Sequence, residues 1–98
     1  MAYFALCTFD LKNASYQDYQ NAYSDLERIG LKRVIVAENG KNVIIPTTTV
    51  SGEFNSQSST AVRDHVCDQV QVAFHARGFT SEVFVVAAGD WAWGGRTT

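Results

Sequence analysis

An apolar run near the start of the chain ends on a carboxylate: Tyr3-Phe4-Ala5-Leu6-Cys7-Thr8-Phe9-Asp10. Successive side chains of a strand point to opposite faces of a sheet. One face of this run would carry the odd-numbered residues 3–9 and the other the even-numbered residues 4–8, and both sets are largely apolar. Strands covered on both sides have this pattern. The run therefore predicts a central strand with helices on one side and another layer, or a partner, on the other.

A helix is predicted next, beginning at Ser15 and ending at Gly30. Ser15 and Asp18 have the spacing of a capping box, in which each side chain accepts a hydrogen bond from a free amide. Gly30 supplies the left-handed turn that helix ends prefer. Apolar residues at three- and four-residue steps predict a buried stripe of Tyr16, Tyr19, Ala22, Tyr23, Leu26 and Ile29. The tyrosines suit a core stripe, and a stacking surface for bases is the alternative.

The middle of the chain predicts a hairpin. Residues 31–37 read as a strand with a β-branched centre, Val34-Ile35-Val36, and Asn39-Gly40 is the strongest short signal for a tight reversal. Residues 42–45 return as the next strand. Pro46 lacks an amide proton and is expected at an edge or a bulge. Residues 47–50 are expected to continue this strand, and Ser51-Gly52 with the polar residues 55–59 to form a flexible connection.

A second helix is predicted after this connection, capped by Ser59 or Thr60 and closed by Gly78. Its buried stripe is expected to hold Val62, Val66, Cys67, Val70, Ala73 and Phe74. Residues 81–88 then form the last strand, rich enough in valine for an interior position in the sheet.

This order of elements is that of a ferredoxin-like βαββαβ sandwich. We expect a single α+β domain over residues 1–98, with a four-stranded antiparallel sheet and two helices on one face. A chain of 98 residues leaves no length for a second domain.

Composition narrows the class of partner. Eight basic and ten acidic residues give a net charge of −2, the wrong sign for holding nucleic acid by phosphate neutralisation alone, although bound metal ions could supply positive charge to a nuclease. No window approaches the about 20 apolar residues of a membrane span, and the first residues do not resemble a secretory signal. Cys7 and Cys67 form no zinc or redox motif and are expected to be buried. These features predict a cytoplasmic protein with reduced thiols and no membrane partner.

Asp10 is the first candidate for chemistry, because strand ends in a βαβ unit present side chains at a rim where ligands bind. One carboxylate holds Mg²⁺ or Mn²⁺ poorly, since these ions require about six ligands, mostly oxygens. Pairing of two subunits could bring two copies of Asp10 together. The alternative is that Asp10 caps the turn between strand and helix.

The apolar strand ending in Phe9-Asp10-Leu11, the amphipathic helix and Gly30 resemble the small CRISPR-associated ferredoxin-like nucleases and the related virulence-associated protein D toxins. Residues 49–54, Thr-Val-Ser-Gly-Glu-Phe, loosely resemble a stretch of that family's third strand. The resemblance implies a ferredoxin-like homodimer in which Asp10 binds a divalent metal for RNA or DNA cleavage. Phe9 stands where the family usually has tyrosine.

Three further groups of residues are candidates for binding. The first group is basic and lies near the predicted hairpin: Arg28, Lys32, Arg33 and Lys41. These residues either form a surface that contacts phosphates or make a solvated strand edge that resists pairing with another strand. Trp91 and Trp93 alternate as on a strand, so both indoles would share one face and either contact a partner or cover their own core. His65 and His75 share no tight metal-binding face and are expected at the surface.

Two functions follow from these residues. The first is a homodimeric endonuclease for RNA or DNA, or a degenerate relative, with Mg²⁺ or Mn²⁺ held by Asp10. The second is a non-catalytic, homodimeric interaction module whose open sheet face, with Trp91 and Trp93, binds a protein or another copy. Two-fold association is predicted for both, since an apolar outer face requires cover.

Overall fold

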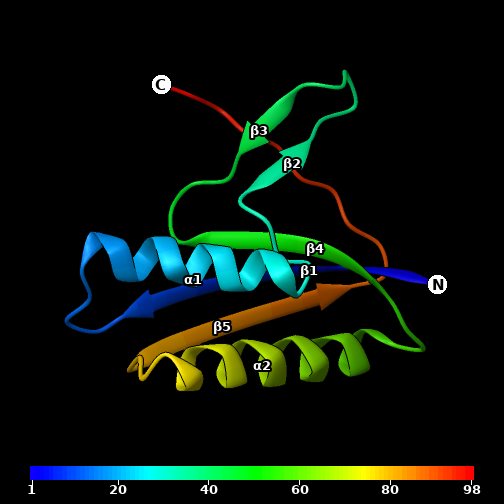
Figure 1. The fold of residues 1–98 in the computed structure, drawn as a ribbon. Helices are drawn as coiled ribbons and strands as arrows, with labels where there is room; N and C mark the ends of the chain where they lie inside the picture. The colour runs from blue at the N-terminus through cyan, green and yellow to red at the C-terminus, as the bar shows by residue number, and fades with distance from the viewer.

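Strand β1 (Ala2–Leu11) lies at the centre of a three-stranded antiparallel sheet in the computed structural model, which describes residues 1–98 (Figure 1). Its neighbours are β4 (Thr49–Asn55) and β5 (Ser81–Ala88), in the order β4-β1-β5. The prediction of a central first strand is therefore confirmed.

Two helices, α1 (Tyr16–Arg28) and α2 (Ser59–Ala76), cover one face of this sheet (Figure 1). The odd-numbered side chains of β1 are buried against them: Tyr3, Ala5, Cys7, Phe9 and Leu11. Leu26 of α1 and Phe74 of α2 belong to the same cluster. The period-2 pattern in the sequence separates the two faces correctly, but both faces are apolar, and the structure shows that the helices cover the odd-numbered one. Neither helix has the length and apolar character that crossing a bilayer requires.

Helix α1 begins with the predicted capping box. The Ser15 hydroxyl accepts a hydrogen bond from the Asp18 amide at 3.1 Å, and the Asp18 carboxylate accepts one from the Ser15 amide at 3.0 Å. Gly30, with φ of +91°, follows the helix as expected. The predicted stripe is wrong at Tyr16, which is 79% exposed. This residue lies in the first turn, and burial on α1 starts further along the helix.

Helix α2 begins one residue earlier than predicted. Its N-cap is Ser58, whose hydroxyl accepts a hydrogen bond from the Ala61 amide at 3.1 Å. The predicted valines and phenylalanine are buried: Val62, Val66, Val70 and Phe74. Cys67 is exposed, contrary to expectation, because it lies about 100° around the helix from Val66.

The predicted second and third strands form a separate two-stranded sheet of β2 (Val34–Val36) and β3 (Asn42–Ile44). The Asn39-Gly40 reversal is confirmed, with Gly40 at φ of +83°. The hairpin stands away from the main sheet (Figure 1). Its connection with that sheet is one isolated bridge between Lys32 and Ser51, with hydrogen bonds of 2.8 and 2.9 Å.

The main sheet therefore has three strands, and the expectation of four is wrong. The predicted continuous strand across Pro46 is divided, because β3 ends at Ile44 and β4 begins only at Thr49. Proline cannot donate a ladder hydrogen bond. The break allows the hairpin to turn away from the sheet while the following residues pair with β1.

Strand β4 includes residues that were expected to be a flexible connection. It pairs with β1 from Thr8–Thr49 to Ala2–Asn55. A side-chain carbon added at Gly52 would collide with the carbonyl oxygen of Gly30. Glycine is required there because two backbone segments approach closely.

Strand β5 spans the predicted residues but lies at an edge of the sheet, so the expected interior position is wrong. Its valine-rich sequence is matched by a neighbour on one side only, β1. The helices do not cover its even-numbered side chains, and Phe84 and Val86 are exposed.

Candidate functional site on the open sheet face

The even-numbered side chains of β1 point away from the helices, and we call this side of the sheet the open face. Cross-strand pairing places Val86 beside Leu6, Phe84 beside Thr8 and Glu82 beside Asp10. The open face therefore changes from apolar near Leu6 to charged at Asp10, where β1 approaches its end.

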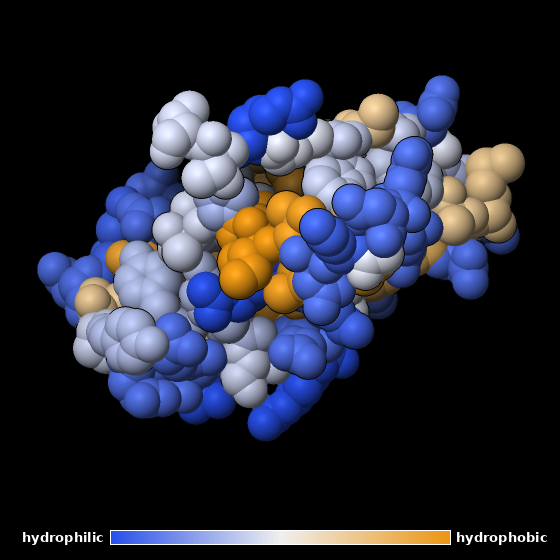
Figure 2. Space-filling model, turned by 90° about the horizontal axis from the view of Figure 1, so that it is seen from above, coloured by the Kyte–Doolittle hydropathy of each residue, from blue (hydrophilic) through white to orange (hydrophobic).

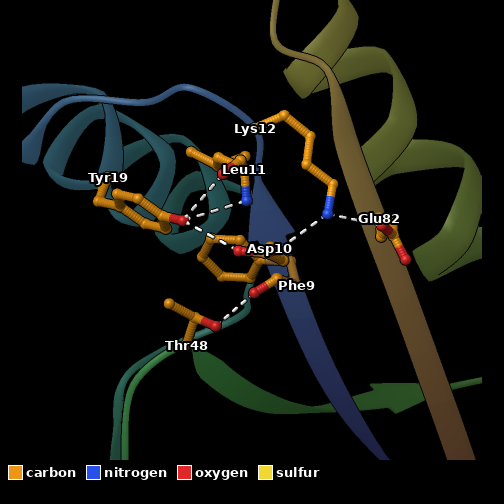
Figure 3. Close-up of polar contacts among 7 residues, drawn as sticks. All are labelled: Phe9, Asp10, Leu11, Lys12, Tyr19, Thr48 and Glu82. Carbon is orange, nitrogen blue, oxygen red and sulfur yellow. Dashed lines mark hydrogen bonds and ion pairs between the residues drawn. The ribbon is translucent and has the colours of Figure 1, made fainter.

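Asp10 lies at that charged end of the open face and is exposed. The Lys12 ammonium lies 3.1 Å from Asp10 Oδ2 and 2.7 Å from Glu82 Oε1. The Tyr19 hydroxyl lies 3.2 Å from Asp10 Oδ1, toward which it donates. Figure 3 shows Lys12 between the two carboxylates and Tyr19 pointing from α1 toward the strand end.

Tyr19 ties the strand end to the helix. Besides its contact with Asp10, its hydroxyl accepts a hydrogen bond from the Leu11 amide at 3.2 Å and lies 3.2 Å from the Leu11 carbonyl oxygen. The ring also stacks near Phe9, with centroids 6.3 Å apart. These contacts make the Tyr19 hydroxyl the group that bonds the backbone at the end of β1, while the Asp10 carboxylate bonds only the side chains of Lys12 and Tyr19.

The electrostatics of this cluster follow from its contacts. The hydrogen bond and charge of Lys12 lower the pKa of Asp10, and the hydrogen bond from Tyr19 acts in the same direction. The pKa of Lys12 is raised, first by its hydrogen bond to Glu82 and then by that to Asp10. Lys12 is thus held as a cation between two anions.

The residues of one chain do not fit a divalent metal ion at Asp10. No group of three or more His, Cys, Asp or Glu side chains lies close enough to hold one. Asp10 and Glu82 offer two carboxylates, and the ammonium of Lys12 already lies between them. Magnesium and manganese require about six ligands, mostly oxygens, at well-defined positions. A metal site here would therefore need groups from another molecule.

The four basic residues singled out from the sequence are engaged in different ways. Arg28 lies 3.6 Å from Asp25, and Arg33 stacks over the Tyr23 ring at 4.1 Å. Lys32 forms the bridge to β4, while Lys41 follows the turn of the hairpin. Their grouping as one phosphate-binding surface remains a prediction.

The two tryptophans belong to a tail without regular secondary structure, not to the strand-like segment that their alternation suggested. Trp91 stacks on Phe4 of the open face, with ring centroids 5.5 Å apart and planes at 18°. Trp93 is 39% exposed. Trp91 therefore covers part of its own sheet. This agrees with the interpretation that the tryptophans cover their own chain, the alternative to contact with a partner.

A cleft of about 640 Å³ lies between the open face, the hairpin and the tail. Phe4 and Leu6 line it from the sheet, Ile35 and Val43 from the hairpin, and Trp93 from the tail. The hairpin also carries two strongly exposed apolar residues, Val36 and Ile44, at 62% and 68% exposure, and Ile44 borders the same cleft. Figure 2 shows apolar side chains gathered at the centre of the face seen from above, the side on which the hairpin stands.

The sequence predicts Asp10 but misses its three partners. Lys12 follows Asp10 by two residues and is a local signal, whereas Glu82 reaches the site only because β5 pairs with β1. Tyr19 was assigned to the apolar stripe of the helix. His65 and His75 are exposed, as predicted. Comparison with known proteins adds no assignment, since neither a protein-family model nor a curated protein matches this chain.

Proposed function

We propose that this chain is a non-catalytic interaction module that forms a homodimer through the open side of its sheet. The observation that carries the proposal is the exposure of Phe84 and Val86, at 65% and 46%, beside Leu6 on a face that the helices do not cover. Exposed apolar groups that cluster on a soluble domain are typical of association surfaces. Aromatic side chains such as Phe84 are frequent anchors in such contacts.

The proposal includes a ferredoxin-like architecture in which the fourth strand of the sheet is shortened to a single bridge. In that fold the missing strand would lie beside β4, on the side away from β1. Lys32 and Ser51 form their bridge at this edge. The hairpin that follows then rises over the open side and, with Trp91, covers only the part near Phe4. Phe84 and Val86 are left for a partner.

The test is the oligomeric state of the double variant Phe84→Ser/Val86→Ser. Light scattering at high micromolar concentration should show a dimer for the wild type and a monomer for this variant, with unchanged circular dichroism. Val72→Ser is the matched control, because Val72 is 66% exposed on α2 and should leave the dimer intact. A wild-type chain that remains strictly monomeric would contradict the proposal.

A second candidate is a metal-dependent endonuclease for RNA or DNA that uses Asp10 with Mg²⁺ or Mn²⁺. It is favoured by the position of Asp10 on the same open face, exposed and oriented by Tyr19. In a dimer, Asp10 of the second chain would be available as a further metal ligand, which a single chain does not provide. Lys32 and Lys41 would contact phosphates on this proposal, together with Arg28 and Arg33.

Cleavage assays separate the two functions. A panel of RNA and DNA with Mg²⁺ or Mn²⁺ should show cleavage that Asp10→Ala abolishes and that Asp68→Ala, at an exposed acid on α2, leaves unchanged. Lys32→Ala and Lys41→Ala should each weaken binding and reduce its salt dependence. Equal cleavage by the wild type and Asp10→Ala, or none by either, would end the nuclease candidate.

A further inference from the structure

The outer edge of β5 presents a row of unpaired backbone groups. In an antiparallel pair, residues alternate between bonding the neighbour and pointing away from it. The Lys12 amide donates to the Thr80 carbonyl at 2.8 Å, which fixes the even-numbered positions as those that bond β1. The odd-numbered residues Ser81, Val83, Val85 and Ala87 therefore direct their N–H and C=O groups outward, away from the sheet.

This edge lacks the features that normally prevent strands from pairing. Proteins protect open edges with lysine, proline, bulges or very short strands. Strand β5 has eight residues, SEVFVVAA, with no proline and no basic residue. Its single charge, Glu82, is already paired with Lys12 at 2.7 Å. The opposite edge of the sheet, on β4, differs because the Lys32–Ser51 bridge occupies part of it.

We propose that β5 pairs antiparallel with β5 of a second copy of this chain, which joins two three-stranded sheets into one continuous sheet. The inference rests on the proposed function and refines it: the two copies meet edge to edge at β5, and Phe84 and Val86 on the open side contact their copies across that edge. A two-fold axis relates a strand to its own copy only in the antiparallel direction, and such self-complementary contacts are the commonest in homodimers.

The side chains indicate the register. With the two-fold axis at Val85, the outward-pointing Val85 groups bond their own copies, and Val83 bonds the partner's Ala87. Phe84 then faces the partner's Val86 on the open side, in a non-hydrogen-bonded pair where side chains come closest. Aromatic and β-branched residues form favourable cross-strand pairs.

The charges also favour a second copy over a charged peptide. In this register Glu82 faces Ala88 of the partner subunit, so the two glutamates do not oppose each other. A basic or acidic strand from another protein would find no free charge on the edge, because Lys12 neutralises Glu82. An uncharged, valine-rich strand is the best complement, and β5 itself is one.

Disulfide trapping tests this register. In a Cys67→Ser background, which removes the exposed native thiol, Phe84→Cys and Val86→Cys are prepared separately. Mild oxidation of the 1:1 mixture should give a disulfide-linked dimer of one chain of each kind, because facing residues of a non-hydrogen-bonded pair meet the distance a disulfide requires. Either variant alone should give at least several-fold less. Equal cross-linking in the separate and mixed samples overturns the register.

Blocking the edge tests the pairing itself. Val83→Lys introduces a charge beside the outward backbone groups and should convert the dimer to a monomer with unchanged circular dichroism, while Val72→Lys on α2 should not. A wild-type dimer that loses association in Phe84→Ser/Val86→Ser but keeps it in Val83→Lys overturns edge pairing and leaves the proposed function standing. A monomeric wild type overturns both.

Discussion

Arg77, which follows helix α2, donates two hydrogen bonds to Asp25 on α1, at 2.7 Å from Nε and 3.0 Å from Nη2. The two-pronged contact joins the C-terminal ends of the helices that cover the sheet. The Asp25 side chain is only 12% exposed. Planar arginine–carboxylate pairs of this kind are among the stronger polar contacts in proteins.

We expect Asp25→Asn to lower the free energy of unfolding by about 1 kcal/mol at neutral pH. The hydrogen bond from Arg77 lowers the pKa of Asp25 in the folded chain. The contribution is therefore complete above the unfolded pKa of about 4 and is lost as the pH falls through the lower folded value. Urea unfolding of wild type and variant between pH 7 and pH 2 should show the difference shrinking. A constant difference would contradict this origin.

Tyr23→Phe should leave stability unchanged or raise it by up to about 1 kcal/mol. The Tyr23 hydroxyl is buried and has no hydrogen-bond partner, so its removal costs no contact. The ring contacts with Phe9 and Arg33 remain in the variant. Thermal unfolding measures the effect, and Tyr23→Leu serves as the control because it loses the aromatic contacts and should be destabilised.

Lys12→Met should raise the pKa of Asp10 toward its ordinary value. Lys12 is the main cause of the lowered pKa and Tyr19 adds to it. Tyr19→Phe should therefore produce a smaller rise of the same sign. The Asp10 carboxyl carbon, followed by NMR during an acid titration, reports both. If neither substitution moved the titration, the ion pair would not form in solution.

Gly52→Ala should destabilise the chain by about 2 kcal/mol or more. The new methyl group would collide with the Gly30 carbonyl oxygen, and a backbone segment cannot move aside as a flexible side chain does. Gly94→Ala is the control, since the nearest atom to its added carbon is 3.9 Å away, at the end of Arg96. Denaturant unfolding measures the stability of both variants. Equal stability would show that the backbone at Gly30 and Gly52 shifts at little cost to make room for the methyl group.

Cys67 should react with a thiol reagent in the folded chain, whereas Cys7 should not. Burial raises the pKa of Cys7 to about 12, so this residue has almost no thiolate at neutral pH. Cys67 is exposed on α2. Mass spectrometry after brief alkylation should find one modified cysteine in buffer and two in denaturant. Rapid labelling of Cys7 without denaturant would indicate that the central strand is accessible.

Elements with local signals could be predicted from the sequence alone. The alternation in residues 3–9 divided β1 into two faces, the Ser15–Asp18 spacing identified the start of α1, and Asn39-Gly40 located the hairpin. These signals depend on neighbours a few residues away, where the period of the backbone decides which side chains share a face.

The folded structure was needed to learn which strands pair. It placed the valine-rich β5 at an edge, made a strand of the polar residues after Thr49, and brought Glu82 to Asp10 and Lys12. A strand's hydrogen bonds are made with residues that lie far away in the sequence, so its composition does not reveal the partner or whether there is one. Gly52 beside Gly30 is the clearest case, because only the folded chain brings those two backbones into contact.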